Sequence, residues 1–204
     1  MKLVKLNVNK HDLKKVAGLI YETDAETLNF YFKNKEKAAE LIQKLIQADG
    51  GSGENTYVTT GDDNQVYGVL VAFKGDEESI KTDLKAYFKN LSFINALKFT
   101  LLEISYIFIG VKIDKDDYYL SDVAVDENCR GRGVGTFILE KSLELAREKG
   151  CKRAVLDVDL KNEGALRLYK RMGFKIFNKK SIRWFGGEKG VYNMEYWLNQ
   201  EMKQ

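Results

Sequence analysis

The stretch VAVDENCRGRGVG, residues 123–135, decides the fold of this chain. It reads as a short β-branched run, an acidic turn, and then Arg130 with three glycines at the start of a helix. A strand that enters a helix through such a loop presents bare backbone N–H groups at the helix N-terminus. The loop can therefore hold a phosphate-bearing ligand without relying on side-chain charge.

The glycines of this loop stand at alternate positions, where they let the backbone approach a ligand closely and adopt angles that other residues avoid. The loop is not a Walker A motif, because no Gly-Lys-Ser/Thr follows it. It is not GxGxxG either, because its third glycine comes too soon. Taken alone, the loop leaves an ordinary glycine-rich connection open as the alternative.

Composition indicates one globular domain over residues 1–204. The net charge is +3, from 33 basic and 30 acidic residues, and no long basic run points to a nucleic acid partner. Cys129 and Cys151 have neither metal-site spacing nor a disulfide framework, so no metal is expected. Because no signal peptide is seen at the first residues, a reducing, cytoplasmic location is the default expectation.

Hydrophobic periodicity predicts an α/β domain with a mixed sheet and helices on its faces. The predicted strands span residues 3–8, 56–60, 65–74, 118–125, 153–159, 174–185 and 191–198. The predicted helices span residues 11–32, 35–48, 134–149 and 162–172, and two more lie in an insertion at 76–117.

The insertion contains a nearly apolar run at residues 93–111, long enough in principle to cross a bilayer. Lys98 and Glu103 lie in its middle, and each would cost about 2.5–3.5 kcal/mol at a membrane centre. The sequence therefore favours a buried or interface helix, and no membrane partner is expected.

A second motif lies downstream, in NEGALRLYKRMGF at residues 162–174. Together with the glycine loop it resembles the GCN5-related N-acetyltransferases, the GNAT superfamily. The loop matches that family's (Arg/Gln)-x-x-Gly-x-(Gly/Ala) signature, and the second stretch matches its Asn-x-x-Ala-x-x-Leu-Tyr-x-x-x-Gly-Phe pattern. The matching residues are Arg130, Gly133, Gly135, Asn162, Ala165, Leu168, Tyr169, Gly173 and Phe174.

The resemblance implies a GNAT fold, with a mixed central sheet whose strands 118–125 and 153–159 part to admit acetyl-CoA. Backbone groups near Val123 would pair with the pantetheine arm, and amides of the glycine loop would hold the pyrophosphate. The cofactor-binding residues implied in this way are Val123, Ala124, Val125, Arg130, Gly131, Arg132, Gly133, Val134, Gly135, Thr136 and Asn162. Asn162 would also serve as an ordinary helix N-cap.

For catalysis, the resemblance implies that the Tyr169 hydroxyl lies beside the thioester sulfur as general acid. A tyrosine beside leucine on a short helix is otherwise more often a core residue. Asp157 is the leading candidate for the base, because it lies five residues before Asn162. In the ribosomal-protein N-terminal acetyltransferases that this stretch resembles, a glutamate lies five residues before the corresponding asparagine. Asp159, Asp122 or a water chain are the alternatives.

The resulting hypothesis is an N-acetyltransferase that moves the acetyl group of acetyl-CoA to a primary amine of a peptide or small molecule. Direct attack in a ternary complex is expected, because no cysteine occupies a credible nucleophile position. A non-catalytic CoA-binding sensor or assembly protein, and a longer acyl donor, remain alternatives. The insertion is expected to set acceptor specificity or form a homodimer contact, with Asp114, Asp116 and Asp117 attracting a cationic amine.

Overall fold

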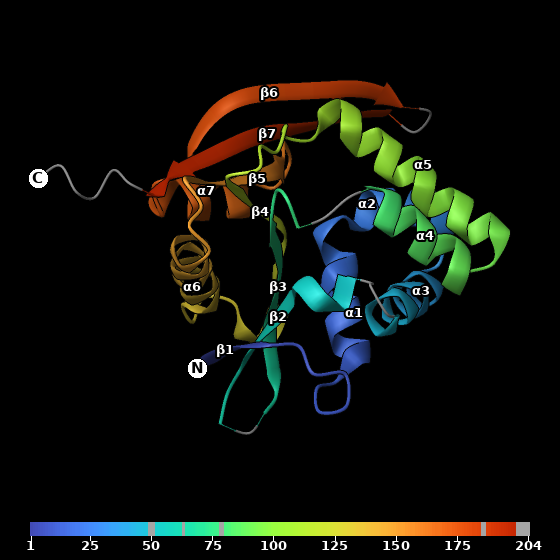
Figure 1. The fold of residues 1–204 in the computed structure, drawn as a ribbon, viewed down its shortest axis with the longest axis horizontal. Coiled ribbons are helices and arrows are strands. Elements are labelled where there is room, and N and C mark those ends of the chain that lie inside the picture. The colour runs from blue at the N-terminus through green and yellow to red at the C-terminus, as the bar shows by residue number, and fades with distance from the viewer. Residues whose placement is uncertain (49–51, 63, 78–79, 185–186, 199–204) are drawn as a thin grey trace, which may run out of the picture.

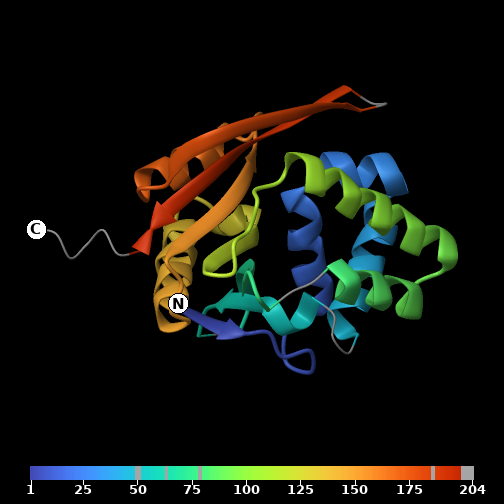
Figure 2. The same ribbon diagram turned by 45° about the horizontal axis from the view of Figure 1, so that its top comes forward.

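The fold is an open seven-stranded sheet in the order β1-β2-β3-β4-β5-β7-β6, covered on both faces by helices (Figures 1 and 2). A computed structural model describes residues 1–48, 52–62, 64–77, 80–184 and 187–198. The strands are β1 (Lys2–Lys5), β2 (Thr56–Thr60), β3 (Val66–Lys74), β4 (Asp117–Val125), β5 (Arg153–Asp159), β6 (Lys175–Trp184) and β7 (Gly187–Trp197).

Two helical layers enclose the sheet, with one hydrophobic core on each face. Successive residues of β3 point alternately into one core and the other. Val69 packs into the core on one face, while its neighbour Leu70 packs into the core on the other. The first layer contains α1 (Leu13–Thr23), α2 (Ala25–Phe32), α3 (Lys35–Gln47), α4 (Ile80–Asn90) and α5 (Phe93–Ile109). The second contains α6 (Val134–Glu148) and α7 (Glu163–Arg171).

The sheet parts between β4 and β5, its parallel pair. These strands pair only along Asp117–Leu120 and Arg153–Leu156. Beyond that point β4 continues with β3 and β5 continues with β7. The predicted mixed sheet with parted strands is thereby confirmed, as is the presence of two helices in the insertion.

Several predicted boundaries were wrong. The helix expected over residues 11–32 is two helices, because the backbone leaves helical angles at Asp24. The strand expected at 3–8 ends at Lys5, and a turn closes on Asn7, whose carbonyl accepts from His11. The last strand begins at 187 rather than 191, and part of the predicted turn before it lies outside the described residues.

Helix α5 is a packed helix of the first layer, as the charges in its middle indicated. The Lys98 ammonium lies 5.3 Å from the centre of the Phe32 ring, and the Glu103 carboxylate accepts a 2.7 Å hydrogen bond from Tyr87. Among the described residues, no helix has both the length and the apolar character needed to cross a membrane. The outward side of α5 is nevertheless apolar and exposed at Phe93, Ile94, Leu97, Leu101, Ile104 and Phe108.

Candidate active site

The glycine loop opens α6 with a backbone that only glycine adopts readily. Gly131 and Gly133 have φ angles of 72° and 80°, and an added Cβ at either would meet open space. Conformation, rather than crowding, therefore requires glycine at these positions. Because Gly133 is the N-cap residue of α6, the loop delivers the amides of the first helical turn to an accessible surface.

Gly135 has a different role from the other two glycines. A Cβ there would lie 2.9 Å from a Leu168 methyl carbon of α7. This glycine lets α6 and α7 approach each other closely, so packing alone explains it. The exposed Arg130 side chain also contacts β4, where its Nε donates a 3.2 Å hydrogen bond to the Val125 carbonyl.

The end of β4 has one edge without a partner strand. Val123 and Val125 face Leu70 and Gly68 of β3, while β5 pairs with β4 only as far as Leu120. The edge that faces the wedge is therefore available to an extended ligand, as the resemblance implied for a pantetheine arm. The Val125 carbonyl already accepts from Arg130, so fewer backbone groups are free than the sequence suggested.

A β-bulge in β4 sets which side chains face the first helical layer. Val71 pairs with Asp122, but the next residue, Ala72, pairs with Leu120, so Ser121 is an extra residue. Strict alternation from Tyr119 would direct Asp122 to the α6 side. With the bulge, Tyr119 and Asp122 both line a cavity on the other side.

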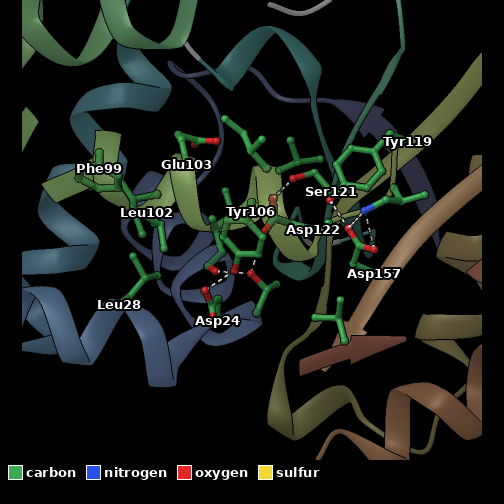
Figure 3. A pocket seen from close by; sticks show the side chains of 18 of the residues that line it. Asp24, Leu28, Phe99, Leu102, Glu103, Tyr106, Tyr119, Ser121, Asp122 and Asp157 are labelled. Carbon is green, nitrogen blue, oxygen red and sulfur yellow. Dashed lines mark hydrogen bonds between the residues drawn. The ribbon is translucent and has the colours of Figure 1, made fainter. Parts of the chain in front are cut away.

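This cavity, of about 420 Å³, lies between the sheet and helices α1 to α5 (Figure 3). Figure 3 shows Tyr119, Asp122 and Asp157 gathered at one end, where β4 and β5 part. Leu28, Phe99, Leu102 and Glu103 gather at the other end, and Tyr106 and Asp24 lie between the two groups. The cavity thus has a carboxylate end against the sheet and a mostly apolar end, with Glu103 as its charged residue, beneath α4 and α5.

Asp157 is held by donors from three elements. Both of its oxygens lie 3.0 Å from the Val111 amide, and one accepts a 2.6 Å bond from the Asn193 amide. The other accepts from the Tyr119 hydroxyl at 3.2 Å. Burial raises the pKa of Asp157, while these hydrogen bonds oppose that shift.

Asp122 is the second carboxylate at this end. It accepts hydrogen bonds from the Thr23 hydroxyl at 2.5 Å and the Ser121 hydroxyl at 2.8 Å. Burial raises the pKa of Asp122, and these two hydroxyl donors oppose the shift. Neither Asp122 nor Asp157 forms an ion pair with any described residue.

A third polar group joins the β6–β7 hairpin to the helices. The Lys189 ammonium lies 2.8 Å from the Asp24 carboxylate and 3.1 Å from the Tyr106 hydroxyl. Tyr106 also donates a short hydrogen bond to Asp24. Asp24 is the residue at which α1 and α2 separate, and it also lines the cavity. The break in the predicted helix therefore lies in one wall of the cavity.

Tyr169 lies on α7, in the core of the opposite layer. Its side chain is buried and its ring centre lies 5.9 Å from that of Phe174. Burial, followed by the charge of Asp122, raises the pKa of the Tyr169 hydroxyl.

Asn162 and Asp159 have clear local roles. Asn162 caps α7 by accepting from the Ala165 amide at 3.0 Å, and Asp159 accepts from the Lys161 amide at 2.7 Å. Asp159 also lines the cavity. The described residues contain no group of three or more His, Cys, Asp and Glu arranged to hold a metal ion.

The acidic cluster of the insertion lies elsewhere. Asp117 and Asp116 form ion pairs with Arg153 and Lys152, both at 2.7 Å, and Asp114 is exposed near the same arginine. None of the three lines the cavity. The carboxylates near the parted strands are instead Asp122 and Asp157. Four other lining residues were not predicted from the sequence: Tyr119, Asp24, Tyr106 and Lys189.

Comparison with known proteins places these features in a family. A model of the acetyltransferase (GNAT) family matches residues 24–174. N-alpha-acetyltransferase 30 of Xenopus laevis is 30% identical over 80 residues, which cover 39% of this chain and 29% of that protein. The chloroplastic GCN5-related N-acetyltransferase 4 of Arabidopsis thaliana is 44% identical over 57 residues, or 28% of this chain and 20% of that protein.

These alignments span less than a third of either curated relative. Among solved structures, an N-acetyltransferase from Staphylococcus aureus Mu50 superposes with a TM-score of 0.72 and 21% identity. That match covers 96% of this chain and all of the other, so the fold extends over nearly the whole length.

Proposed function

The chain belongs to the acetyltransferase (GNAT) family, and on this premise we propose that it transfers the acetyl group of acetyl-CoA to a primary amine. One observation supports the proposal most strongly. The strands β4 and β5 separate between two features: the glycine loop, of a type that binds phosphate, lies on one side, and the carboxylate-lined cavity lies on the other. Two ligands could meet there within one complex, which favours direct transfer.

The donor fits the residues on the α6 side of the wedge. Gly131, Arg132 and Gly133 would present backbone amides to the pyrophosphate, followed by the first-turn amides of α6. The unpartnered edge of β4, at the backbone groups of Val123 and Val125, would bind the pantetheine arm, and Asn162 would lie beside it. When bound, acetyl-CoA supplies an activated acyl group with a thiolate leaving group.

The acceptor amine must lose a proton before or during attack. With an ordinary amine pKa near 10.4, deprotonation at pH 7 costs about 4–5 kcal/mol. We assign Asp157 as the proton acceptor, directly or through one water, because it lines the cavity and burial raises its pKa. Asp122 is the alternative base and otherwise attracts the ammonium group.

The second proton movement occurs at the leaving group. As the amine nitrogen bonds to the acetyl carbon, the carbon–sulfur bond breaks and the sulfur takes a proton from the Tyr169 hydroxyl. The nitrogen releases its second proton to solvent, and solvent returns a proton to Tyr169. The raised pKa keeps this hydroxyl protonated at neutral pH but also makes it a weaker acid. Because a thiol with pKa near 8.5 leaves readily, this step contributes less than amine deprotonation.

A non-catalytic CoA-binding protein of the same fold is the competing proposal. Release of free thiol from acetyl-CoA, followed across free amines and peptides, separates the two. The enzyme gives amine-dependent release together with acetylated amine. A sensor binds acetyl-CoA but leaves it intact with every amine.

A further inference from the structure

We infer that the cavity beneath the insertion selects a primary amine that carries an apolar alkyl or aryl group. This inference rests on the proposed function and specifies the acceptor class. It follows from how polar and apolar side chains are distributed along the cavity, from the parted strands to α3 and α4.

The carboxylate end is complementary to an ammonium group. Asp122 and Asp157 both line it, and neither has an ion-pair partner among the described residues. The lysine of the lining, Lys189, already pairs with Asp24 at 2.8 Å. An anionic head group would add like charge beside these half-buried carboxylates, whereas an ammonium would compensate them.

The far end offers an acceptor mostly hydrocarbon and aromatic surface. Its lining includes buried side chains of α2, α3 and α5, all of which also belong to the core. They are Leu28, Ile42, Leu45, Phe99 and Leu102. Glu103 also lines this end, and its carboxylate accepts a hydrogen bond from the Tyr87 hydroxyl at 2.7 Å. Away from that pair, a polar substituent or a peptide backbone would lose hydration without gaining comparable partners.

Helix α5 connects the two ends. Leu102, Tyr106 and Gly110 follow one another at four-residue spacing along the cavity. The rise of an α-helix places roughly 12 Å of axis between the first and the last of them. The next residue, Val111, is bound to Asp157 through its amide, which fixes this helix end to the carboxylate end. The insertion therefore sets how long an acceptor the cavity accepts.

Isothermal titration of a series of amines into the CoA-saturated protein tests this selection without requiring catalysis. The series runs from ethylamine to octylamine, with 2-phenylethylamine, ethanolamine and putrescine. Affinity is expected to rise about fourfold for each added methylene until the cavity is full, because each buried methylene contributes a similar increment. Affinity that does not depend on chain length, or a preference for ethanolamine or putrescine, would overturn the inference.

Tetrapeptides distinguish the two sources of such an amine. Peptides that begin with phenylalanine, leucine or serine and are otherwise identical form a second arm. Preference for an apolar first residue, with binding tighter than that of free amines, assigns the site to protein N-termini. Tighter binding of free amines assigns it to small molecules, and preference for serine contradicts the inference.

Variants of the lining provide the structural control. Leu102→Ala should move the optimum to a longer amine, and Ala86→Leu should move it to a shorter one, since both residues line the cavity. Leu101→Ala lies on the exposed side of the same helix and should leave the optimum unchanged. Chain-length-dependent binding without thiol release would contradict the proposed transfer alone. Thiol release without chain-length dependence would contradict this inference alone.

Discussion

At the scale of single residues, the proposed mechanism depends on Tyr169 and on two carboxylates from the opposite face of the sheet. Tyr169 belongs to the core beneath α7, while Asp122 and Asp157 line the cavity beneath the insertion. The charge of Asp122 nevertheless raises the pKa of the Tyr169 hydroxyl. The proposed mechanism places the proton donor and the proton acceptors at the parting of β4 and β5.

Removing the Tyr169 hydroxyl tests the proton donor. Tyr169→Phe should lower kcat by about 100-fold, the lower end of the usual range for acid–base catalysis, because a thiolate leaves without much assistance. The affinity for acetyl-CoA, measured by titration calorimetry, should change little. Tyr21→Phe is the matched control, a buried tyrosine of α1 outside the cavity lining. Unchanged turnover in the Tyr169 variant would remove it from the mechanism.

Asparagine substitutions distinguish the two candidate bases. Asp157→Asn should lower kcat by at least about 100-fold, since the amine proton then has no acceptor in direct reach. Asp122→Asn should mainly raise KM for the amine, because it removes charge that attracts the ammonium. Single-turnover rates at saturating amine provide the comparison. The reverse pattern would transfer the role of base to Asp122.

The half-buried Asp122 carboxylate also has a consequence for stability. Its folded-state pKa is raised, so any stability it contributes is present at low pH and is lost as pH rises through that pKa. Asp122→Asn should therefore raise the melting temperature relative to wild type more at pH 8 than at pH 4. Asp126→Asn should do the opposite, because hydrogen bonding to Lys15 lowers the pKa of Asp126. Thermal unfolding at both pH values decides the sign.

At the scale of elements, the glycine loop and α6 form the proposed binding site of acetyl-CoA. The loop reaches α6 through two left-handed glycines, and the same helix ends near a third, Gly150, with a φ of 68°. Gly133 and Gly150 lie at opposite ends of the helix but share backbone geometry and open space for a Cβ. The two glycines therefore form a matched pair for substitution.

Gly133→Ala and Gly150→Ala should each destabilise the fold by about 1–2 kcal/mol, the cost of placing an L side chain in the left-handed region. Only Gly133→Ala should also weaken acetyl-CoA binding, because its amide group lies in the proposed pyrophosphate loop. Titration calorimetry with acetyl-CoA measures the difference. Equal loss of affinity in both variants would argue against a specific role for the loop.

The elements were largely predictable, because periodicity depends on local sequence. Strands 56–60 and 153–159 have the predicted bounds, and the two family motifs identified the parted strands. The bulge at Ser121 was not predictable, because it depends on pairing between β3 and β4. Asp24, at the break between α1 and α2, is bound by Lys189, 165 residues away in the chain. Long-range contacts of this kind leave no local pattern to read.

At the scale of the whole molecule, α4 and α5 complete the mostly apolar end of the cavity, together with side chains of α2 and α3. The Val111 amide, just after α5, is bound to the Asp157 carboxylate at the other end. In the proposed function, acceptor binding and chemistry would therefore share one residue.

The most direct test of the proposed acetyl transfer is its stoichiometry in a mixture of protein, acetyl-CoA and amine. Purified protein, acetyl-CoA and hexylamine or 2-phenylethylamine are incubated together, and free CoA and acetylated amine are quantified by mass spectrometry. The account predicts equal amounts of the two products, formed about 100-fold more slowly by Tyr169→Phe. Acetyl-CoA that binds but remains intact with every amine and peptide tested would contradict it.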